Sequence, residues 1–360
     1  MNAVEDREAW LRLALVPGIG ESALHRLIEA FDSPEAALAA SRTQLQLLLR
    51  ANQIEALQAG PDAGLLKESL AWLGDEAHHL VTWLDPDYPQ QLREMADPPA
   101  LLYGKGRREL LGGNGLAIVG SRTATAQGEA NAEAFARILS EAGITIVSGL
   151  ALGIDAAAHR GGLKGKGSTI AVVGTGLDRV YPARNKALAH EIAQNGLLLS
   201  EFPLGTNSAP GHFPKRNRII SGLSHAVLVV EAALNSGSLI TARLALEQGR
   251  EVMAIPGSIH SPLSKGCHAL IKQGAKLVES AQDIVEELAW PAVAAVPAPP
   301  GTSREHIEPV LQHLGHDPLS LDQLAERSGL TVEALSAKLL TLELEGLVAQ
   351  LPGGRYQRLS

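Results

Sequence analysis

Short apolar runs alternate with stretches of helical periodicity through the middle of the chain. The runs are rich in β-branched side chains and lack polar alternation, which is typical of strands buried on both faces of a parallel sheet. With helices between most of them, they predict an α/β fold whose core is a Rossmann-like, doubly wound, mostly parallel sheet. The predicted strands are Leu116–Val119, Ile144–Val147, Thr169–Val173, Leu197–Ser200, Ala226–Val230 and Val252–Ile255, and the predicted helices are Gly128–Ala142, Ile154–Leu163, Asn185–Gln194 and Ser238–Gln248.

Residues 1–80 show apolar positions at helical spacing, which predicts a small helical domain in front of the core. Inside it, Leu15-Val-Pro-Gly-Ile-Gly20 precedes a helix-like stretch, Ser22–Phe31. A Pro-Gly-Ile-Gly hairpin between two helices is typical of a helix-hairpin-helix, or SAM-like, domain, whose glycine amides can contact a DNA phosphate. An ordinary turn with glycine at a helix C-cap explains the hairpin equally well, because the segment lacks the basic residues that a strong binder would carry.

The core is predicted over residues 81–290, and turns around Asp85-Pro-Asp-Tyr-Pro89 mark its beginning. A Pro/Ala-rich stretch, residues 291–303, follows the core and predicts an extended, semi-rigid linker.

Residues 304–360 predict a winged-helix domain, because three helix-like stretches precede two short strands. The last helix carries three glutamates against one lysine, so it would not sit easily in a DNA major groove. This charge pattern favours a protein-interaction or regulatory wing over a sequence reader. The predicted helices are Arg304–Leu314, Leu321–Ser328 and Val332–Glu345, the strands are Leu347–Leu351 and Gly354–Gln357, and the charged residues are Glu333, Glu343, Glu345 and Lys338.

Composition narrows the classes of protein that remain. A chain of 360 residues with a hydrophobic fraction of 45% can form packed cores in two or three domains. The single cysteine, Cys267, excludes a disulfide framework and a cysteine-based zinc site. The sequence shows neither a leader-like segment nor an apolar run of membrane-spanning length, so we expect no membrane partner and a cytoplasmic location. A net charge of −8 argues against coating nucleic acid through the overall field, but a local basic groove can still bind phosphates.

Ligands of doubly wound sheets bind at the carboxyl ends of the strands, and the loops there lack the common cofactor motifs. The first loop has Gly120 and Gly128 but no G-x-G-x-x-G, and the chain has no G-x-x-x-x-G-K-[ST]. No group of histidines and carboxylates has metal-ligand spacing, and no nucleophile–base pair can be argued. These loops therefore disfavour a nicotinamide or flavin cofactor, Walker-type ATP hydrolysis and a metal, and we expect no cofactor and no catalytic residues.

Groups suited to phosphates recur instead. The stretch His212–Ala242 begins with three cations beside an aromatic residue, with no acid among them, and continues into a buried strand. The loop after that strand opens a helix, with Ser238 as a plausible N-cap, so backbone N–H groups are free for an anion. A cation track beside an aromatic ring that can stack a base indicates a surface for a nucleic-acid backbone. The predicted DNA-binding residues are Arg122, Phe213, Lys215, Arg216, Arg218, Ser236, Gly237 and Ser238.

Plainer roles are open for some polar residues of these loops. A structural salt bridge is an alternative for Arg122. Asp155 and His159 lie four residues apart on one helical face, and we expect helix capping and local hydrogen bonding rather than catalysis. Asp178, shortly before Tyr181-Pro182, is expected to hold a turn.

A series of motifs runs through the core. In order, they are Asp85-Pro-Asp-Tyr-Pro89, Pro98–Gly104, Val119-Gly-Ser-Arg122, Ser148–Asp155 with Ala158-His159, Gly174–Asp178 with Tyr181-Pro182 and Asn185, Phe213–Ile220, Glu231-Ala232, Ser236–Ala242, Gly249–Val252 and Pro256-Gly257. Any one of them alone would be weak, but together and in this order they are highly specific. Over most of its length the chain resembles DNA-processing protein A, the DprA/Smf family.

The resemblance implies a Rossmann-like core that binds single-stranded DNA without enzymatic turnover. It also implies a role in natural transformation, with protection of incoming single strands, loading of the RecA recombinase and homodimerisation through the core. The DNA site of the family maps onto Arg122, onto Phe213 as the stacking aromatic, and onto the basic run Lys215, Arg216 and Arg218. The Ser236–Ser238 loop lies close by in the motif order.

Two other functions stay open at this point. Rossmann-like folds include nucleotide-processing hydrolases that cleave ribosyl bonds, for which Glu201, Glu231 or Asp155 would have to supply the carboxylate. Such hydrolases typically carry a P-G-G-x-G-T-x-x-E loop, whereas Asn235–Thr241 here is followed by no glutamate on the next turn. The third function is transcriptional regulation through the winged helix.

Overall fold

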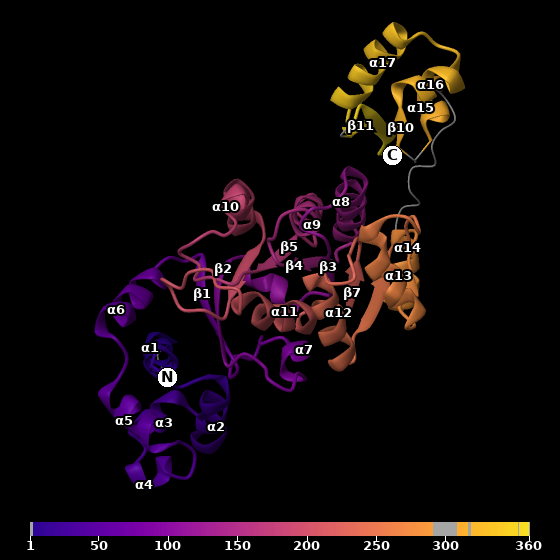
Figure 1. The fold of residues 1–360 in the computed structure, drawn as a ribbon. Helices are drawn as coiled ribbons and strands as arrows, with labels where there is room; N and C mark the ends of the chain where they lie inside the picture. Colours follow the sequence, from indigo (N-terminus) through magenta and orange to yellow (C-terminus); the bar gives the residue numbers. More distant parts are fainter. Residues whose placement is uncertain (1–2, 291–307, 316–317, 352, 360) are drawn as a thin grey trace.

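The computed structural model describes residues 3–290, 308–315, 318–351 and 353–359. Within them, the centre is a nine-stranded sheet in the order β1-β2-β6-β5-β4-β3-β7-β8-β9 (Figure 1). Neighbouring strands from β3 to β9 are parallel, whereas β2 pairs antiparallel with both β1 and β6. The strands are β1 (His78–Thr82), β2 (Leu101–Gly106), β3 (Gly115–Val119), β4 (Thr145–Ser148), β5 (Thr169–Val172), β6 (Leu197–Ser200), β7 (Ala226–Val229), β8 (Glu251–Ala254) and β9 (Lys276–Leu277).

The predicted α/β fold is confirmed. The six predicted strands are β3 to β8, and each begins and ends within one residue of its predicted position. Strands β1, β2 and β9 are not among the predictions. The first two carry histidine, glycine and lysine at the edge of the sheet, which interrupt the apolar run, and β9 has only two residues. Because β1 begins at His78, the sheet starts before the predicted boundary at residue 80.

Alternate residues of β3 contribute to two different apolar cores. Leu116 and Ile118 pack with α8, α9 and α14 on one face, whereas Ala117 and Val119 pack with α11, α12 and α13 on the other (Figure 1). Both faces of the sheet are therefore covered, as a doubly wound fold requires. The helices of the core are α7 (Gln90–Arg93), α8 (Ala126–Glu141), α9 (Ile154–Gly162), α10 (Lys186–Asn195), α11 (His212–Gly222), α12 (Gly237–Glu247), α13 (Lys265–Lys272) and α14 (Ala281–Glu287), with 3₁₀ turns at Arg108–Gly112, Ala183–Asn185 and Pro262–Ser264.

Helix α11 covers a stretch where the sequence analysis predicts no helix. Its proline, Pro214, lies in the first turn, where the missing N–H costs nothing. Successive residues of a helix point about 100° apart. Arg216 therefore points away from Lys215 and Arg218, which lie three residues apart on one side of the helix. The three cations do not form the continuous track that their sequence suggests.

The N-terminal helices pack against the β1–β2 edge of the sheet (Figure 1). Trp10 and Leu27 belong to the same buried apolar cluster as Tyr103 and Leu198 of the sheet. In the hairpin between the first two helices, Gly18 adopts a positive φ of 85°. The helices are α1 (Ala3–Ala14), α2 (Glu21–Phe31), α3 (Pro34–Ala39), α4 (Arg42–Leu45), α5 (Ala51–Ala59) and α6 (Ala63–Trp72).

The winged-helix prediction for the end of the chain is also confirmed. Three helices surround a small apolar core, and a three-stranded sheet in the order β10-β12-β11 completes the unit. The predicted linker, residues 291–303, and the start of the first predicted helix lie outside the described residues. In the part of the chain that the structure describes, no helix is long and apolar enough to cross a membrane. The elements are α15 (Pro309–Leu314), β10 (Leu319–Ser320), α16 (Leu321–Ser328), α17 (Val332–Leu344), β11 (Val348–Leu351) and β12 (Arg355–Arg358).

Candidate nucleic-acid interface

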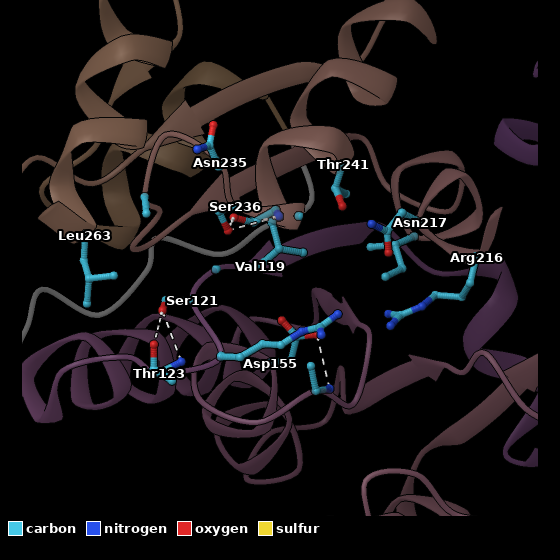
Figure 2. A pocket seen from close by; sticks show the side chains of 17 residues that line it. Val119, Ser121, Thr123, Asp155, Arg216, Asn217, Asn235, Ser236, Thr241 and Leu263 are labelled. Atoms are coloured by element: carbon cyan, nitrogen blue, oxygen red, sulfur yellow. Dashed lines mark hydrogen bonds between the residues drawn. The ribbon is translucent and has the colours of Figure 1, made fainter. Parts of the chain in front are cut away.

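A cavity of about 520 Å³ opens at the carboxyl ends of β3 and β7 (Figure 2). Strands β4, β5 and β6 are added on one side of β3, and β7 and β8 are added on its other side. Strands β3 and β7 therefore flank the topological switch point. Crevices at this position are the usual ligand sites of doubly wound sheets. The lining comes from the loop after β3, the loop after β4, helix α11 and the start of α12, and its charged members are Arg122, Asp155 and Arg216.

Arg216 is the most unusual member of this lining. Its side chain belongs to a residue that is only 4% exposed, and its guanidinium points into the cavity (Figure 2). Among the described residues, no hydrogen bond or ion pair reaches this guanidinium, and its Nε is buried without a partner. Burial lowers the pKa of Arg216 to about 10, so the group still carries its charge at neutral pH. The carboxylate of Asp155 offsets this cost of burial only in part, and an anion in the cavity would offset more of it.

The loop after β4 makes room for Arg216. A Cβ atom at Gly149 would lie 1.5 Å from Nη1 of Arg216, so any larger residue would displace the guanidinium. The carboxylate of Asp155 accepts hydrogen bonds from the N–H groups of Gly149 and Ala151, at 3.2 and 3.3 Å. Burial raises the pKa of Asp155, against the attraction of Arg216 and these two N–H groups. Asp155 therefore holds the loop that Arg216 crosses.

His159 also holds the loop after β4 in place. Its Nε2 accepts from the N–H of Leu150 at 3.2 Å, and its Nδ1 donates to the hydroxyl of Thr169 at 2.7 Å. Burial lowers the pKa of His159 to about 3, so the ring is neutral. Local hydrogen bonding by His159 was the prediction and is confirmed. Asp155 lies inside helix α9, whose N-cap is Gly153, so its predicted capping role is wrong and its hydrogen bonds go to the loop instead.

Arg122 and Phe213 meet at the rim of the cavity. The guanidinium carbon of Arg122 lies 5.4 Å from the centre of the Phe213 ring, and no salt bridge holds Arg122 among the described residues. The ring of Tyr181, which is half exposed, lies 5.7 Å from that of Phe213. These three side chains and Arg216 line a second, smaller cavity of about 70 Å³. The rim thus combines a cation with two aromatic faces, which suits a planar base next to a phosphate.

The N-terminus of α12 lies at the cavity, as the sequence predicts, but its N-cap residue differs from the predicted one. The N-cap is Ser236, whose hydroxyl accepts from the N–H of Ser238 at 3.3 Å, so the predicted cap at Ser238 is wrong. The two serine hydroxyls also bond each other at 2.7 Å. Ser236, Gly237 and Ser238 all line the cavity, as does Asn235 before them (Figure 2). The positive end of the helix therefore faces the same space as Arg216.

The other two cations of α11 are directed elsewhere. Arg218 is 6% exposed and is paired with the buried carboxylate of Glu201 and, at 3.2 Å, with Asp97. Lys215 lies 2.8 Å from the second oxygen of Glu201 and remains 45% exposed. The sequence places no acid near these cations, but the fold brings Glu201 from the end of β6 to both of them. Arg218 is thus a structural ion pair and not part of the cavity, which corrects its assignment to the DNA site.

A second carboxylate approaches this ion-pair cluster from the N-terminal helices. Glu21, the first residue of α2, accepts a hydrogen bond from the N–H of Ala100 at 2.7 Å. Burial, together with the charge of Glu201, raises the pKa of Glu21 to about 7. The hairpin glycines thus precede a helix whose first carboxylate is turned toward the core.

Two exposed cations beside the rim are absent from the predicted site. Asn185 donates hydrogen bonds to the carbonyls of Leu150 and Ala151, which ties the start of α10 to the loop after β4. Arg184 and Lys186 flank Asn185 on the same chain segment as Tyr181, and both are exposed. In the sequence, these two cations could have been found because they flank Asn185 shortly after Tyr181-Pro182. The sequence analysis interprets that segment as a turn only.

Together, the fold and the cavity define a Rossmann-like protein with a cavity lined by two arginines at the switch point of its sheet. Residues 79–289 match the family described as DNA recombination-mediator protein A, and residues 293–354 match the DprA winged helix domain. The chain belongs to the DprA/Smf family, as the motifs indicate. Protein Smf of Escherichia coli is 41% identical over 98% of this chain and 96% of its own length. DNA processing protein DprA of Streptococcus pneumoniae is 52% identical over 57% of this chain and 72% of its own length.

Solved structures of the family share the fold. The crystal structure of DNA processing protein A from Streptococcus pneumoniae is similar with a TM-score of 0.66 and 38% identity, covering 80% of this chain and 98% of that one. DNA processing protein A from Helicobacter pylori, whose structure is described for its single-stranded DNA binding mode, has a TM-score of 0.54 and 33% identity, covering 59% of this chain and 95% of that one.

Proposed function

We propose that this protein binds single-stranded DNA at the switch-point cavity and acts by binding, without turnover. A phosphate of the strand would lie between Arg216, Arg122 and the N–H groups at the start of α12. The neighbouring base would stack on Phe213, beside Tyr181. The observation that carries this proposal is the buried guanidinium of Arg216, which has no partner among the described residues and faces the cavity.

The stacking rim favours a single strand over a duplex. A base can lie on the Phe213 ring only if one of its faces is free, and in a duplex both faces are covered by neighbouring base pairs. The Helicobacter pylori relative, described for its single-stranded DNA binding mode, supports the same preference. Lys215 can add a phosphate contact only in competition with Glu201, which it already meets at 2.8 Å.

Within the cell, the proposed role follows the family. The protein would work in the cytoplasm during natural transformation, where it protects incoming single strands and loads the RecA recombinase on them. It would act as a homodimer that presents two such sites to one strand. Membership of the DprA/Smf family is the support for these roles.

The arrangement of the carboxylates disfavours the nucleotide hydrolase. Glu201 is held by Lys215 and Arg218, and Glu231 accepts hydrogen bonds from the N–H and hydroxyl of Thr125. Asp155 is committed to two backbone N–H groups. A ribosyl hydrolase needs a carboxylate that faces the sugar, and each of these three is bound to the protein itself.

The test is a salt titration of binding to a fluorescein-labelled oligothymidylate and to a duplex of equal length. We expect the wild type to prefer the single strand, and Arg122→Ala/Arg216→Ala to lose at least about 100-fold in affinity, with a salt slope lower by about 1.4 for two lost phosphate contacts. Phe213→Ala should weaken binding without changing the slope, because it removes stacking and no charge.

Lys67→Ala, which removes an exposed lysine from α6, is the matched control and should bind as the wild type does. An unchanged affinity in the folded double variant would refute the site. Equal affinity for the single strand and the duplex would refute the stacking mechanism.

A further inference from the structure

Helix α17 of the winged-helix unit is apolar on two sides. Leu335, Leu339 and Leu342 are buried in the core of the unit, as a helix of this fold requires. On the outer side, however, Leu340 is 59% exposed and Leu344 is 82% exposed. Residues four apart lie on one helical face, so these two leucines form a continuous apolar surface.

Acidic side chains surround this surface. Glu333 lies seven residues before Leu340, and Glu343 lies three residues after it, so both share the face of the leucines. Neither glutamate has a salt bridge among the described residues. The single lysine of the helix, Lys338, is paired with Glu308 of the same unit and does not neutralise them. We call Val332, Glu333, Leu340, Glu343 and Leu344 the α17 face.

The charge of the α17 face argues against DNA as its ligand. In helix-turn-helix proteins the recognition helix enters the major groove, where phosphates line both sides. Phosphates repel carboxylates, and the α17 face offers two carboxylates and exposed leucines with no cation. An anionic membrane surface is disfavoured for the same reason.

The charge also argues against a second copy of the chain. Pairing of two α17 helices would bury the leucines, but it would bring together four glutamates and no cation from the two faces. Like charges at a helix interface destabilise it and select against the wrong partner. A partner with lysines or arginines beside its apolar stripe meets both features at once.

We propose that the α17 face is the docking site for a basic amphipathic helix of another protein. Leucine side chains of α17 would pack into the apolar stripe of that helix, and Glu333 and Glu343 would pair with cations on either side of the stripe. The 13 residues of α17 present a surface about 20 Å long, enough for three turns of a partner helix. The DNA cavity and the α17 face then serve different ligands.

The experiment uses the full-length protein and two synthetic peptides. The first peptide has leucines at heptad a and d positions and lysines beside them, and the second has glutamates in place of the lysines. By fluorescence anisotropy, we expect the lysine peptide to bind, with an affinity that falls as salt rises, and the glutamate peptide to bind at least tenfold more weakly.

Substitutions in the α17 face separate the apolar contribution to peptide binding from the electrostatic one. Leu340→Ser/Leu344→Ser should weaken the lysine peptide about 100-fold, or about tenfold for each leucine removed from the interface. Glu333→Lys/Glu343→Lys should reverse the preference between the two peptides. The matched controls are Leu47→Ser, at an exposed leucine between α4 and α5, and Glu55→Lys, at an exposed glutamate of α5, and both should leave peptide binding intact.

If the α17 face binds something other than a basic helix, these experiments give different results. Equal binding of both peptides, or binding that the leucine variant retains, would overturn the proposal. So would self-association in sedimentation that only the leucine variant abolishes, because a second copy would then cover the face. Loss of duplex binding in the leucine variant would assign the face to DNA. All variants should keep the thermal midpoint and the single-strand affinity of the wild type, since these positions are exposed.

Discussion

Replacing Arg216 by methionine should stabilise the fold and weaken DNA binding at the same time. Arg216→Met keeps an unbranched side chain as far as the position of Nε and removes the charged guanidinium. Burial lowers the pKa of Arg216 from the ordinary arginine value to about 10. One pKa unit corresponds to 1.36 kcal/mol, so the charged form costs the folded state about 3 kcal/mol. Because the apolar replacement removes that cost, we expect the free energy of unfolding to rise by about 1–3 kcal/mol.

The effect on binding has the opposite sign. A hydrogen bond between charged groups contributes about 1.5–3 kcal/mol, so loss of the Arg216–phosphate contact should weaken single-strand binding about 10- to 100-fold. The logarithmic salt slope should fall by about 0.7, the value for one phosphate on a single strand. Urea unfolding followed by circular dichroism measures the first effect, and anisotropy of a labelled oligothymidylate between 50 and 300 mM salt measures the second.

Arg218→Met is the matched control on the same helix. Arg218 is equally buried but is paired with Glu201, so its removal leaves a buried carboxylate with fewer partners. We expect a loss of about 3 kcal/mol in stability for Arg218→Met. If Arg216→Met is also destabilised and binds DNA as the wild type does, then Arg216 is a structural residue and the reasoning is refuted.

Two further predictions test the surroundings of the site. Gly149→Ala places a Cβ atom 1.5 Å from Nη1 of Arg216, so it should weaken single-strand binding about as much as Arg216→Met. The double variant should be no weaker than Arg216→Met alone in the same anisotropy assay, and additive losses would contradict displacement of the guanidinium. Glu21 has a pKa raised by burial from 4.5 to about 7, so the folded state binds its proton more tightly than the unfolded state does. Its ionisation therefore costs stability as pH rises from about 4.5 to 7, by about 3 kcal/mol, and Glu21→Gln should be more stable than the wild type at pH 8 but not below pH 4.5. The same stability difference at both pH values in urea unfolding would contradict this linkage.

The strands of the core were predictable because their chemistry is local. A strand buried on both faces must be apolar at every position, so β3 to β8 are visible as apolar runs. Strand β1 lies at the edge of the sheet with β2 next to it, and the two carry histidine, lysine and glycine, so their sequences lack that signature. The position of β2 beside β6 depends on pairing across about 95 residues of chain, which no local pattern contains.

The composition of the site was visible in the sequence, but its geometry was not. Arg122, Arg216 and the Ser236–Ser238 loop line the main cavity, and Phe213 lines the adjoining smaller cavity with Arg122 and Arg216, as the carboxyl ends of neighbouring parallel strands require. Tyr181 was missed as a second aromatic face because its Tyr-Pro turn lies more than 30 residues before Phe213 in the chain.

The sequence by itself determined the family, the doubly wound core and a cluster of cations beside one aromatic ring. The tertiary structure decided which of those cations is free. Lys215, Arg216 and Arg218 are alike in sequence, but helix α11 turns Arg216 away from the other two, and Glu201 at the end of β6 pairs with Lys215 and Arg218. Arg216 alone of the three lines the cavity without a partner among the described residues. A charge is neutralised by whatever the fold places within a few ångströms of it, and that distance is set by packing between segments far apart in the chain.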